Sequence, residues 1–305
     1  MENLFKPSQD LAASITKAAS RQTAFTIRFL ADHNLMDDAF RAYAYFRWVD
    51  DWIDQKTRQK DERMAFVDRQ NGLIRDLIQG LEPQDLTPEE QMLKELIQID
   101  QGSTVHSGLR SYIHNLMAVM TFDAERRGRL ITQNELNGYA RTLAVAVTEC
   151  LHYFIGRDCS APRTEDRYLA VTGAHITHML RDTLDDNEAG YFNIPSEFLK
   201  ANKISPFDVD SDAYRSWVRS RVQLARDYFK AGRRYMTQVE NFRCRLAEYA
   251  YIARFEAVLD AIEREDYHLR ADYRECKTLA AGVQMGWSTL WSAFNGKTLK
   301  LNRVH

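Results

Sequence analysis

Three carboxylates stand close together near the start of the chain, directly after an aromatic stretch. Asp50 and Asp54 are four residues apart, so a helix of about 3.6 residues per turn places them on one face, with Asp51 beside them. Like charges at that spacing repel each other, and the aromatic neighbours indicate partial burial, which adds a desolvation cost. The cluster therefore predicts that a positive charge binds here.

A second acidic cluster lies later in the chain. His178, Asp182 and Asp186 recur at every fourth residue, so they form a ladder along one helix face. If the two helices face each other, their carboxylates supply the oxygen ligands that Mg²⁺ prefers, and water and substrate phosphate complete the coordination shell. We therefore expect Mg²⁺ as the metal cofactor, with Mn²⁺ as the alternative.

Either acidic cluster alone is better explained as a solvated helix surface, because a single motif match is weak support for a site. Two such clusters are present, however, and each is embedded in apolar sequence close to an arginine. The arginines are Arg47 and Arg181. The combination favours a site that binds a metal ion together with a diphosphate.

The order and spacing of these residues resemble the squalene/phytoene synthase family over about residues 20–280. In that family a Tyr-x-x-x-Arg sequence precedes the first acidic motif, and the second reads Arg-Asp-x-x-x-Asp before a turn and a proline. The matching residues are Tyr43, Arg47, Arg181, Asp182, Asp186, Gly190 and Pro195, with two later stretches at 225–232 and 259–267. The resemblance implies an all-α fold, an isoprenoid-synthase-type helical bundle with a central cavity.

The resemblance and the acidic spacing together predict a set of site residues. Residues expected to be catalytic are Asp50, Asp54, Asp182, Asp186, Tyr43, Arg47 and Tyr139. Residues expected to bind metal are Asp50, Asp51, Asp54, His178, Asp182 and Asp186. Residues expected to contact the substrate are Phe25, Arg28, Phe29, Arg181, Ala144, Val147, Thr148, His178 and Asn193. For the aromatic residues and the apolar helix stripe, packing in the core is the alternative explanation.

Four residues depart from what the family commonly has at the matching positions. His175 stands in place of Gln, His178 in place of a metal-binding Asn, Asn193 in place of Tyr, and Phe255 in place of a late Tyr. Imidazole prefers borderline cations to Mg²⁺, so His178 has two alternative roles, as a charged partner of Asp182 or as a proton donor to the departing diphosphate. These departures leave the identity of the product open.

The activity that the resemblance implies is a Mg²⁺-dependent prenyltransferase. Such an enzyme condenses two farnesyl or geranylgeranyl diphosphates head-to-head, through a cyclopropyl diphosphate, to a squalene- or phytoene-type product. NADPH is needed only for the squalene type, and the missing Gly-rich dinucleotide motif decides nothing because the family does not use one. The alternatives are ionisation for cyclisation, transfer to another acceptor or hydrolysis, or a non-catalytic scaffold. The intact acidic clusters argue against the scaffold.

The domain organisation follows from composition. Only 6 Pro and 13 Gly occur in 305 residues and no Gly/Ser-rich linker interrupts the helical periodicity, so we expect one all-helical domain over 1–305. Helix boundaries are predicted at several places. Ser8 and Asp37 are expected to cap helices, Gly80 to end one and Thr87 to cap the next, and a Thr132–Glu135 capping box to begin a helix that reaches about Gly156.

The remaining patterns bear on location and partners. A net charge of −2 gives no sign of nucleic-acid binding. The sequence starts without a signal-peptide pattern and contains no run of eighteen apolar residues, so we expect a cytoplasmic protein. In the tail at 285–305, Trp287, Trp291 and Phe294 precede Lys297 and Lys300, which would suit peripheral association with a membrane surface or packing against the domain. Nothing in the sequence predicts the oligomeric state or the prenyl chain length.

Overall fold

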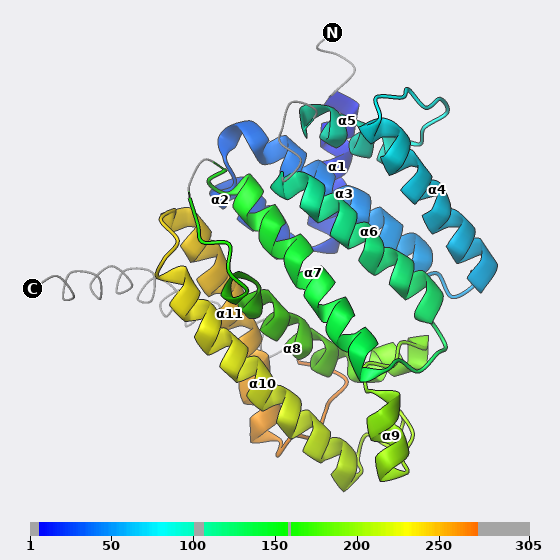
Figure 1. Cartoon of the computed structure of the whole chain (residues 1–305), viewed down its shortest axis with the longest axis vertical. Helices are drawn as coiled ribbons and strands as arrows, with labels where there is room; N and C mark the ends of the chain where they lie inside the picture. Colours follow the sequence, from blue (N-terminus) through cyan, green and yellow to red (C-terminus); the bar gives the residue numbers. More distant parts are fainter. Residues whose placement is uncertain (1–5, 101–106, 158–159, 274–305) are drawn as a thin grey trace, which may run out of the picture. The chain divides into compact units, whose positions relative to one another are not determined.

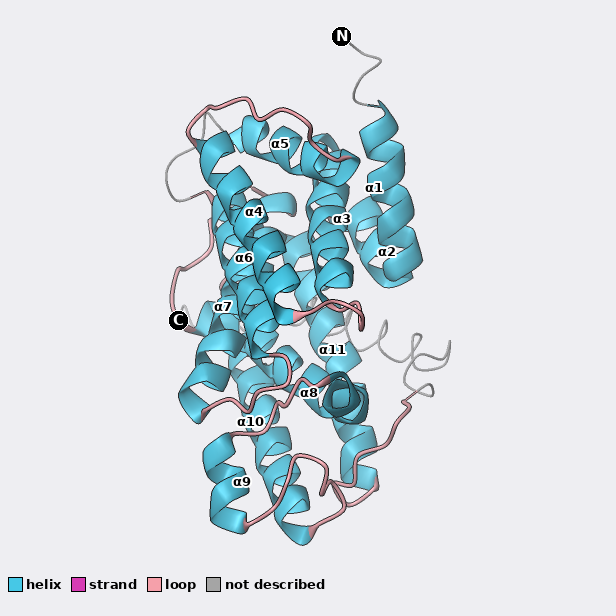
Figure 2. Ribbon diagram, turned by 90° about the vertical axis from the view of Figure 1, so that its right-hand side faces the viewer, coloured by secondary structure: helices cyan, strands magenta, loops and turns pink. Residues whose placement is uncertain are grey.

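The computed structural model describes residues 6–100, 107–157 and 160–273. Within these ranges every regular element is a helix and no strand occurs, which Figure 2 shows. The elements are α1 (Lys6–Ala19), α2 (Arg21–Leu30), η1 (His33–Leu35), α3 (Met36–Ile53), α4 (Lys60–Ile78), α5 (Pro88–Asp100), α6 (Gly108–Arg126), α7 (Gln133–Phe154), α8 (Asp166–Ala189), α9 (Ser196–Asn202), α10 (Asp212–Met236) and α11 (Phe242–Arg264). The all-α prediction is confirmed. The tail at 285–305 lies outside the described residues.

The chain forms two compact units. The amino-terminal unit comprises residues up to 125 together with 145–157, and the carboxy-terminal unit comprises 126–144 and the chain from 158 onward. Helix α7 contributes its first half to the carboxy-terminal unit and its second half to the amino-terminal unit. The predicted single domain with a central cavity stays a prediction.

Helix α3 is the centre of the amino-terminal unit, where it packs against α1, α2 and α5. Ala12 of α1, Ala44 of α3 and Met92 of α5 are fully buried and form one cluster. Alanine at two of these three positions lets the helix backbones approach closely, and close packing provides the dispersion contacts that hold the helices together.

A buried polar network joins the same three helices. Arg41 Nη1 lies 2.6 Å from Asp38 Oδ1, and Arg41 Nε lies 2.7 Å from Glu95 Oε2. The Ser8 hydroxyl donates to that Glu95 oxygen at 3.0 Å. The prediction that Ser8 caps the first helix is wrong, because α1 begins at Lys6 and the Ser8 side chain is used in this network instead.

Side chains on α4 and α5 fix the orientation of α3. The Tyr45 hydroxyl donates to Gln70 Oε1 at 2.9 Å, and Gln70 Nε2 donates to Glu90 Oε1 at 2.9 Å. The rings of Trp52 and Phe66 stack with their centroids 3.9 Å apart. Contacts at two levels of α3 therefore limit its rotation about its own axis, so the face that bears the first acidic motif is held in place.

Most of the predicted helix boundaries are confirmed. Gly80 follows α4 with φ of 78°, and the backbone N–H of Glu90 donates to the Thr87 hydroxyl at 3.2 Å before α5. The prediction for Asp37 is wrong, because α3 begins at Met36 and Asp37 lies in its first turn. The Asp37 carboxylate instead accepts a hydrogen bond from Gln9 Nε2 at 2.9 Å.

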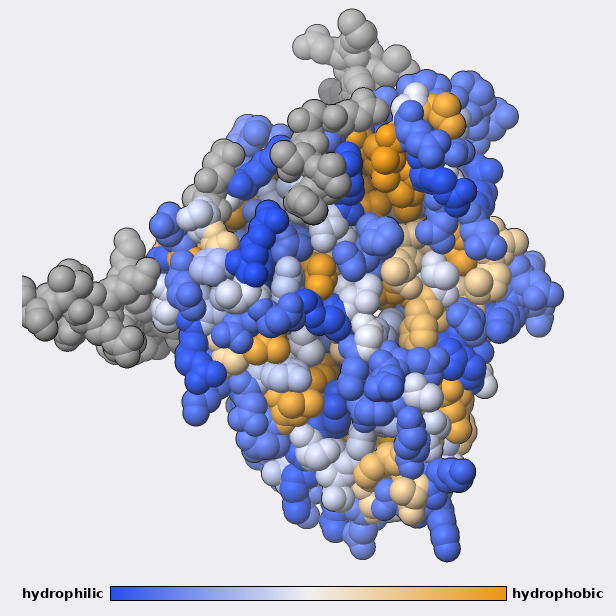
Figure 3. Space-filling model, in the orientation of Figure 1, coloured by the Kyte–Doolittle hydropathy of each residue, from blue (hydrophilic) through white to orange (hydrophobic). Residues whose placement is uncertain are grey.

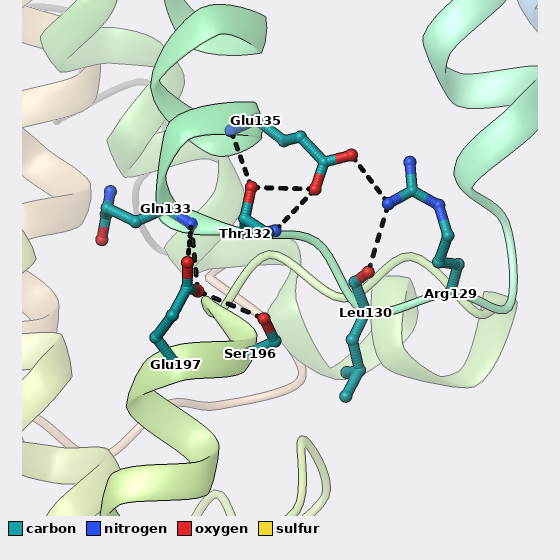
Figure 4. Close-up of polar contacts among 7 residues, drawn as sticks. All are labelled: Arg129, Leu130, Thr132, Gln133, Glu135, Ser196 and Glu197. Atoms are coloured by element: carbon teal, nitrogen blue, oxygen red, sulfur yellow. Dashed lines mark hydrogen bonds and ion pairs between the residues drawn. The ribbon is translucent and has the colours of Figure 1, made fainter.

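The capping box that begins α7 is formed as the sequence predicts (Figure 4). The Thr132 hydroxyl accepts from the backbone N–H of Glu135 at 3.2 Å, and the Glu135 carboxylate accepts from the backbone N–H of Thr132 at 2.7 Å. Two amides that the helix leaves without partners are thereby satisfied. The helix ends at Phe154, two residues before Gly156, whose φ is 80°.

Helix α8 packs against α10 and α11 in the carboxy-terminal unit (Figure 1). Two glycines allow the closest approach between α8 and α10. A Cβ atom added to Gly232 would lie 2.6 Å from the Cβ of Ala170, and one added to Gly173 would lie 3.1 Å from the carbonyl oxygen of Ala225. The position of α8, which carries the second acidic motif, therefore depends on backbone-to-backbone packing.

The surface shown in Figure 3 is mainly hydrophilic, and its hydrophobic residues occur in several separate groups. Among the described residues, the large apolar side chains that are exposed are Phe25, Phe29, Ile78, Leu81, Ile99, Leu130, Phe207 and Phe242. Scattered exposure of this kind is normal for folded proteins. Among the helices of the described residues, none has both the length and the apolar composition needed to cross a membrane.

Candidate functional site

The first acidic motif lies at the end of α3, where Arg47 pairs with two of its carboxylates. Arg47 Nη1 is 3.2 Å from Asp50 Oδ2, and Arg47 Nε donates to Asp51 Oδ2 at 3.0 Å. Asp54 is the residue that caps the helix, and its backbone N–H still donates to the Asp50 carbonyl at 3.0 Å. The three predicted carboxylates and the predicted arginine therefore lie within about two turns at the end of α3.

The electrostatic state of Asp50 is unusual. Burial raises the pKa of Asp50 to about 7, and repulsion from Asp54 adds to the effect. Arg47 opposes this rise but does not cancel it. Asp123 of α6 is a further negative neighbour that also raises the pKa of Asp50. Several carboxylates therefore act on Asp50 together with burial, and a bound cation would favour its charged form.

Tyr43 lies one turn before Arg47 on α3. Burial raises its pKa above the ordinary value of 10.0, and the nearby side chains of Thr23 and Ser20 partly oppose that rise. Ser20 also caps α2, where its side chain accepts from the backbone N–H of Thr23 at 3.2 Å. The start of α2 therefore lies close to the predicted catalytic tyrosine.

The predicted substrate contacts on α2 lie on its exposed side. Phe25 and Phe29 are stacked, with their ring centroids 5.9 Å apart, and are 56% and 67% exposed. Arg28 between them is also exposed. Burial in the core is therefore not the explanation for these two aromatic residues, and their contact with substrate stays a prediction.

The second acidic motif lies on α8 and centres on Asp182. Arg181 donates to both oxygens of that carboxylate at 2.6 Å, and His178 Nε2 lies 2.8 Å from Asp182 Oδ2. Burial alone would raise the pKa of Asp182, but the hydrogen bonds from Arg181 and His178 outweigh it and lower the pKa below its ordinary value. Asp182 is thus held as a carboxylate, with two positively charged or polarised neighbours.

Asp186, one turn further along α8, has a different environment. Its Oδ2 atom accepts a hydrogen bond from Asn193 Nδ2 at 2.8 Å, and its backbone carbonyl accepts from the N–H of Tyr191 at 2.7 Å. The helix ends three residues later at Ala189 and is capped by Gly190, whose φ of 89° suits glycine. The turn therefore brings Asn193, a predicted substrate contact, back to Asp186.

Two aromatic residues of α11 lie next to this motif. The ring of Phe255 is 6.3 Å from His178 and 5.0 Å from Tyr251, centroid to centroid. Burial raises the pKa of Tyr251 to about 12, and Arg181 is among the charges that act on it. Tyr251, one turn before Phe255, thus places a phenol in the neighbourhood where the family's late tyrosine is expected.

Tyr139 of α7 contacts His175 of α8, with 5.1 Å between their ring centroids. His175 is 7% exposed, and among the described residues neither of its ring nitrogens has a hydrogen-bond partner. Burial lowers its pKa well below 6.5, and the positive charges of Arg126 and Arg221 lower it further. His175 is therefore a neutral imidazole beside the predicted catalytic tyrosine.

The remaining predicted substrate contacts lie along α7. Ala144 and Thr148 are buried, whereas Val147 is partly exposed. Within the described ranges, the hydroxyl of Thr148 has no hydrogen-bond partner. Packing in the core explains Ala144, so contact of this stripe with a prenyl chain stays a prediction.

The carboxylates suit Mg²⁺ in kind. In the ranges that the structure describes, no group of three or more His, Cys, Asp or Glu side chains is arranged to hold a metal ion. Mg²⁺ usually binds through one or two carboxylates and fills its shell with waters and substrate phosphate, so it does not require such a group. The neighbouring carboxylates of Asp54, Asp123 and Asp51, which raise the pKa of Asp50, support the fit because a cation would favour its charged form. The assignment of metal ligands stays a prediction.

Two residues of interest were not predicted from the sequence. Asp123 contributes to the negative charge around Asp50, and Arg126 donates to Asn193 Oδ1 at 2.9 Å. The stretch around them, Phe122-Asp-Ala-Glu-Arg126, reads as an ordinary charged helix end. The spacing of Arg126 from the apolar residues of α6 is the one signal that could have indicated its burial.

Comparison with known proteins gives a consistent result. A family model described as squalene/phytoene synthase matches residues 16–280. A chloroplastic phytoene synthase from Daucus carota is 28% identical over 116 residues, which are 35% of this chain and 29% of that protein. The chain therefore matches under a third of the length of this curated relative.

Two solved structures share the fold. Squalene synthase HpnC from Alicyclobacillus acidocaldarius has a TM-score of 0.67 at 19% identity, covering 87% of this chain and 97% of that one. A dehydrosqualene synthase in complex with ligand has a TM-score of 0.72 at 16% identity, covering 93% of this chain and 96% of that one. At these identities the likeness concerns the fold.

Proposed function

We propose, from the premise that this chain belongs to the squalene/phytoene synthase family, that it ionises prenyl diphosphates and joins two of them head-to-head. Members of the family are prenyltransferase-type enzymes. The resemblance seen in the sequence is thereby confirmed at the level of the family. The observation that best supports the activity is that each acidic motif lies on a helix with an arginine paired to it.

The substrates we propose are farnesyl or geranylgeranyl diphosphate, with Mg²⁺ as cofactor. Diphosphate leaves an allylic carbon only when its charge is offset, and Mg²⁺ bound to it would supply that offset. We propose that each acidic motif binds Mg²⁺ within its own unit. Asp50 and Asp51 of α3 with the capping Asp54 would bind it in the amino-terminal unit, and Asp182 and Asp186 of α8 in the carboxy-terminal unit. A metal requirement is typical of the family, which agrees with this assignment.

Arg47 and Arg181 are proposed to bind the diphosphate. A guanidinium group offers several N–H donors in a plane and binds phosphate oxygens in pairs. In the structure both arginines already pair with aspartates, so each is held at the site by its carboxylate before substrate binds. Each would then stabilise negative charge on the leaving group as the C–O bond breaks.

The allylic cation formed in this step must be kept from water. Tyr139 and the α11 pair Tyr251 and Phe255, all of the carboxy-terminal unit, are proposed to shield it, because aromatic faces attract cations and apolar walls exclude water. A catalytic role for Tyr43 stays a separate proposal. The cation then joins the double bond of a second prenyl diphosphate. The product is a cyclopropyl diphosphate, with loss of one diphosphate and one proton.

The second ionisation releases the other diphosphate, and the rearranged cation ends in one of two ways. Loss of a proton gives a phytoene-type triene, whereas hydride from NADPH gives a squalene-type product. A second candidate function is a diverted fate of the first cation, such as cyclisation, transfer to another acceptor or hydrolysis. The replacement of two family phenols by Asn193 and Phe255 favours this candidate, since both residues lie beside α8.

Diphosphate release from farnesyl or geranylgeranyl diphosphate, measured with and without Mg²⁺, tests the proposal. We expect Mg²⁺-dependent release that falls at least about 100-fold in Asp182→Asn, because removal of a transition-state charge partner has an effect of this size. Asp185→Asn on the same helix is a matched control, since Asp185 is exposed. Wild-type protein that releases no diphosphate from either substrate would refute the proposal.

A further inference from the structure

The connection after α6 runs alongside the connection after α8. The backbone N–H of Gly128 donates to the carbonyl of Gly190 at 2.8 Å, and that of Ser196 donates to the carbonyl of Ile131 at 2.8 Å. A Cβ atom added to Gly190 would lie 3.2 Å from the nitrogen of Gly128. The two connections are therefore held together at both ends by backbone contacts, which leave little room for adjustment.

Between these anchors, Arg126 and Asn193 form a chain of hydrogen bonds that ends at Asp186. Arg126 Nη1 donates to Asn193 Oδ1 at 2.9 Å, and Asn193 Nδ2 donates to Asp186 Oδ2 at 2.8 Å. Arg126 and Asn193 are only 4% and 6% exposed. A flipped amide would point its NH₂ group at the guanidinium donors and its oxygen at the carboxylate, so only one orientation satisfies both neighbours.

Aromatic rings hold Arg126 in turn. Its guanidinium carbon lies 4.8 Å from the ring centroid of Tyr139 and 5.1 Å from that of Tyr191. Such cation–π contacts favour the charged form of arginine and restrict its position. One buried cation therefore contacts the predicted catalytic tyrosine directly and the predicted metal ligand Asp186 through a single amide.

We propose that Arg126 and Asn193 are positioning residues, which fix the Asp186 carboxylate in the orientation that binds metal. The inference rests on the function proposed above. A carboxylate offers about four lone-pair sites, so the bond from Asn193 leaves others for the ion. In this chain the Asn193 amide, oriented by Arg126, donates the hydrogen bond to Asp186. A tyrosine at this position, as the family usually has, could donate only through its phenol.

Metal affinity is the readout that separates this role from a merely structural one. Mn²⁺ binding to the full chain, measured by electron paramagnetic resonance with inorganic diphosphate present, is compared among variants. We expect Asn193→Ala and Arg126→Gln each to weaken Mn²⁺ binding about 10- to 100-fold, the usual effect of losing a partner of a metal ligand. The double variant is expected to bind no more weakly than the worse single one, because both residues act through one chain.

A matched control and a conservative variant make the test decisive. Asn187 is 5% exposed and adjacent to Asp186, but its amide donates to the carbonyl of Pro206 at 2.7 Å. Asn187→Ala should therefore lower thermal stability and leave Mn²⁺ affinity within about twofold. Asn193→Asp keeps the size of the side chain and still accepts from Arg126, but it cannot donate to Asp186, so the same loss of affinity is expected.

The outcomes are distinguishable. Mn²⁺ affinity unchanged in folded Asn193→Asp would overturn the inference and leave the proposed function standing. Equal losses of affinity in Asn187→Ala and Asn193→Ala would also overturn it, because the effect would then follow from general destabilisation. Wild-type protein that binds no Mn²⁺ with diphosphate present would refute the inference and the proposed function together.

Discussion

Replacing Glu248 by glutamine tests the electrostatics of the carboxy-terminal unit. Glu248 lies on α11 and is 1% exposed, and among the described residues its Oε1 atom has no hydrogen-bond partner. Burial raises its pKa from 4.5 to about 8, although Arg167 opposes the rise. In the folded chain the carboxyl group is therefore protonated at neutral pH, whereas in the unfolded chain it is ionised.

The sign of the pH dependence follows from this difference. Below about pH 4.5 both states hold the proton, so Glu248 adds no pH dependence to the free energy of unfolding. Between about pH 4.5 and pH 8 only the folded state holds it, so the free energy of unfolding falls by at most about 1.4 kcal/mol per pH unit. Above about pH 8 the folded state also ionises and the loss stops growing. From about pH 5 to pH 8 the effect is thus on the order of 4 kcal/mol.

The assay is urea unfolding of wild type and Glu248→Gln at several pH values, followed by circular dichroism. A glutamine amide has its own cost of burial, but that cost is the same at every pH. The stability of the variant relative to wild type should therefore increase as the pH rises from about 5 to 8. Glu263→Gln on the exposed face of α11 is the control, because loss of a surface ion pair costs under about 1 kcal/mol. A constant difference between wild type and Glu248→Gln across this pH range would refute the reasoning.

Two further predictions concern local packing and capping. Gly232→Ala should lower the free energy of unfolding by about 1–3 kcal/mol, because its Cβ would lie 2.6 Å from that of Ala170, whereas Gly72→Ala should raise it by about 0.5–1 kcal/mol, since nothing lies within 4 Å. Urea midpoints that move in the same direction would contradict this. Thr132→Ala should cost about 1 kcal/mol by removing the cap that Glu135 shares, and an unchanged melting temperature would count against it.

Local signals predicted much of the fold. The capping box at Thr132 and the glycine at 80 depend on residues within one turn, so the sequence alone contains the information. The cap predictions for Ser8 and Asp37 are wrong because the partners of these side chains lie far away in the sequence. Both are good caps by type, but each finds a tertiary partner elsewhere, Glu95 for Ser8 and Gln9 for Asp37. A capping preference worth about 1 kcal/mol does not determine a boundary when such contacts compete.

The candidate site also contains both local contacts, which the sequence predicts, and long-range contacts, which it does not. The pairing of His178 with Asp182 is an i, i+4 contact on one helix, and it was among the roles considered from spacing alone. Arg126 and Asn193 lie 67 residues apart, so their contact depends on how the connections after α6 and α8 pack. A hydrogen bond between residues so far apart in the sequence can be identified only from the folded structure.

The stoichiometry of diphosphate release per product tests the central claim most directly. Purified protein is incubated with Mg²⁺ and farnesyl or geranylgeranyl diphosphate, with and without NADPH, and released diphosphate is counted while mass spectrometry identifies the product. The account predicts a hydrocarbon of doubled prenyl length and two diphosphates for each molecule formed. One diphosphate for each prenyl alcohol, or for each cyclised product of single length, would contradict head-to-head coupling.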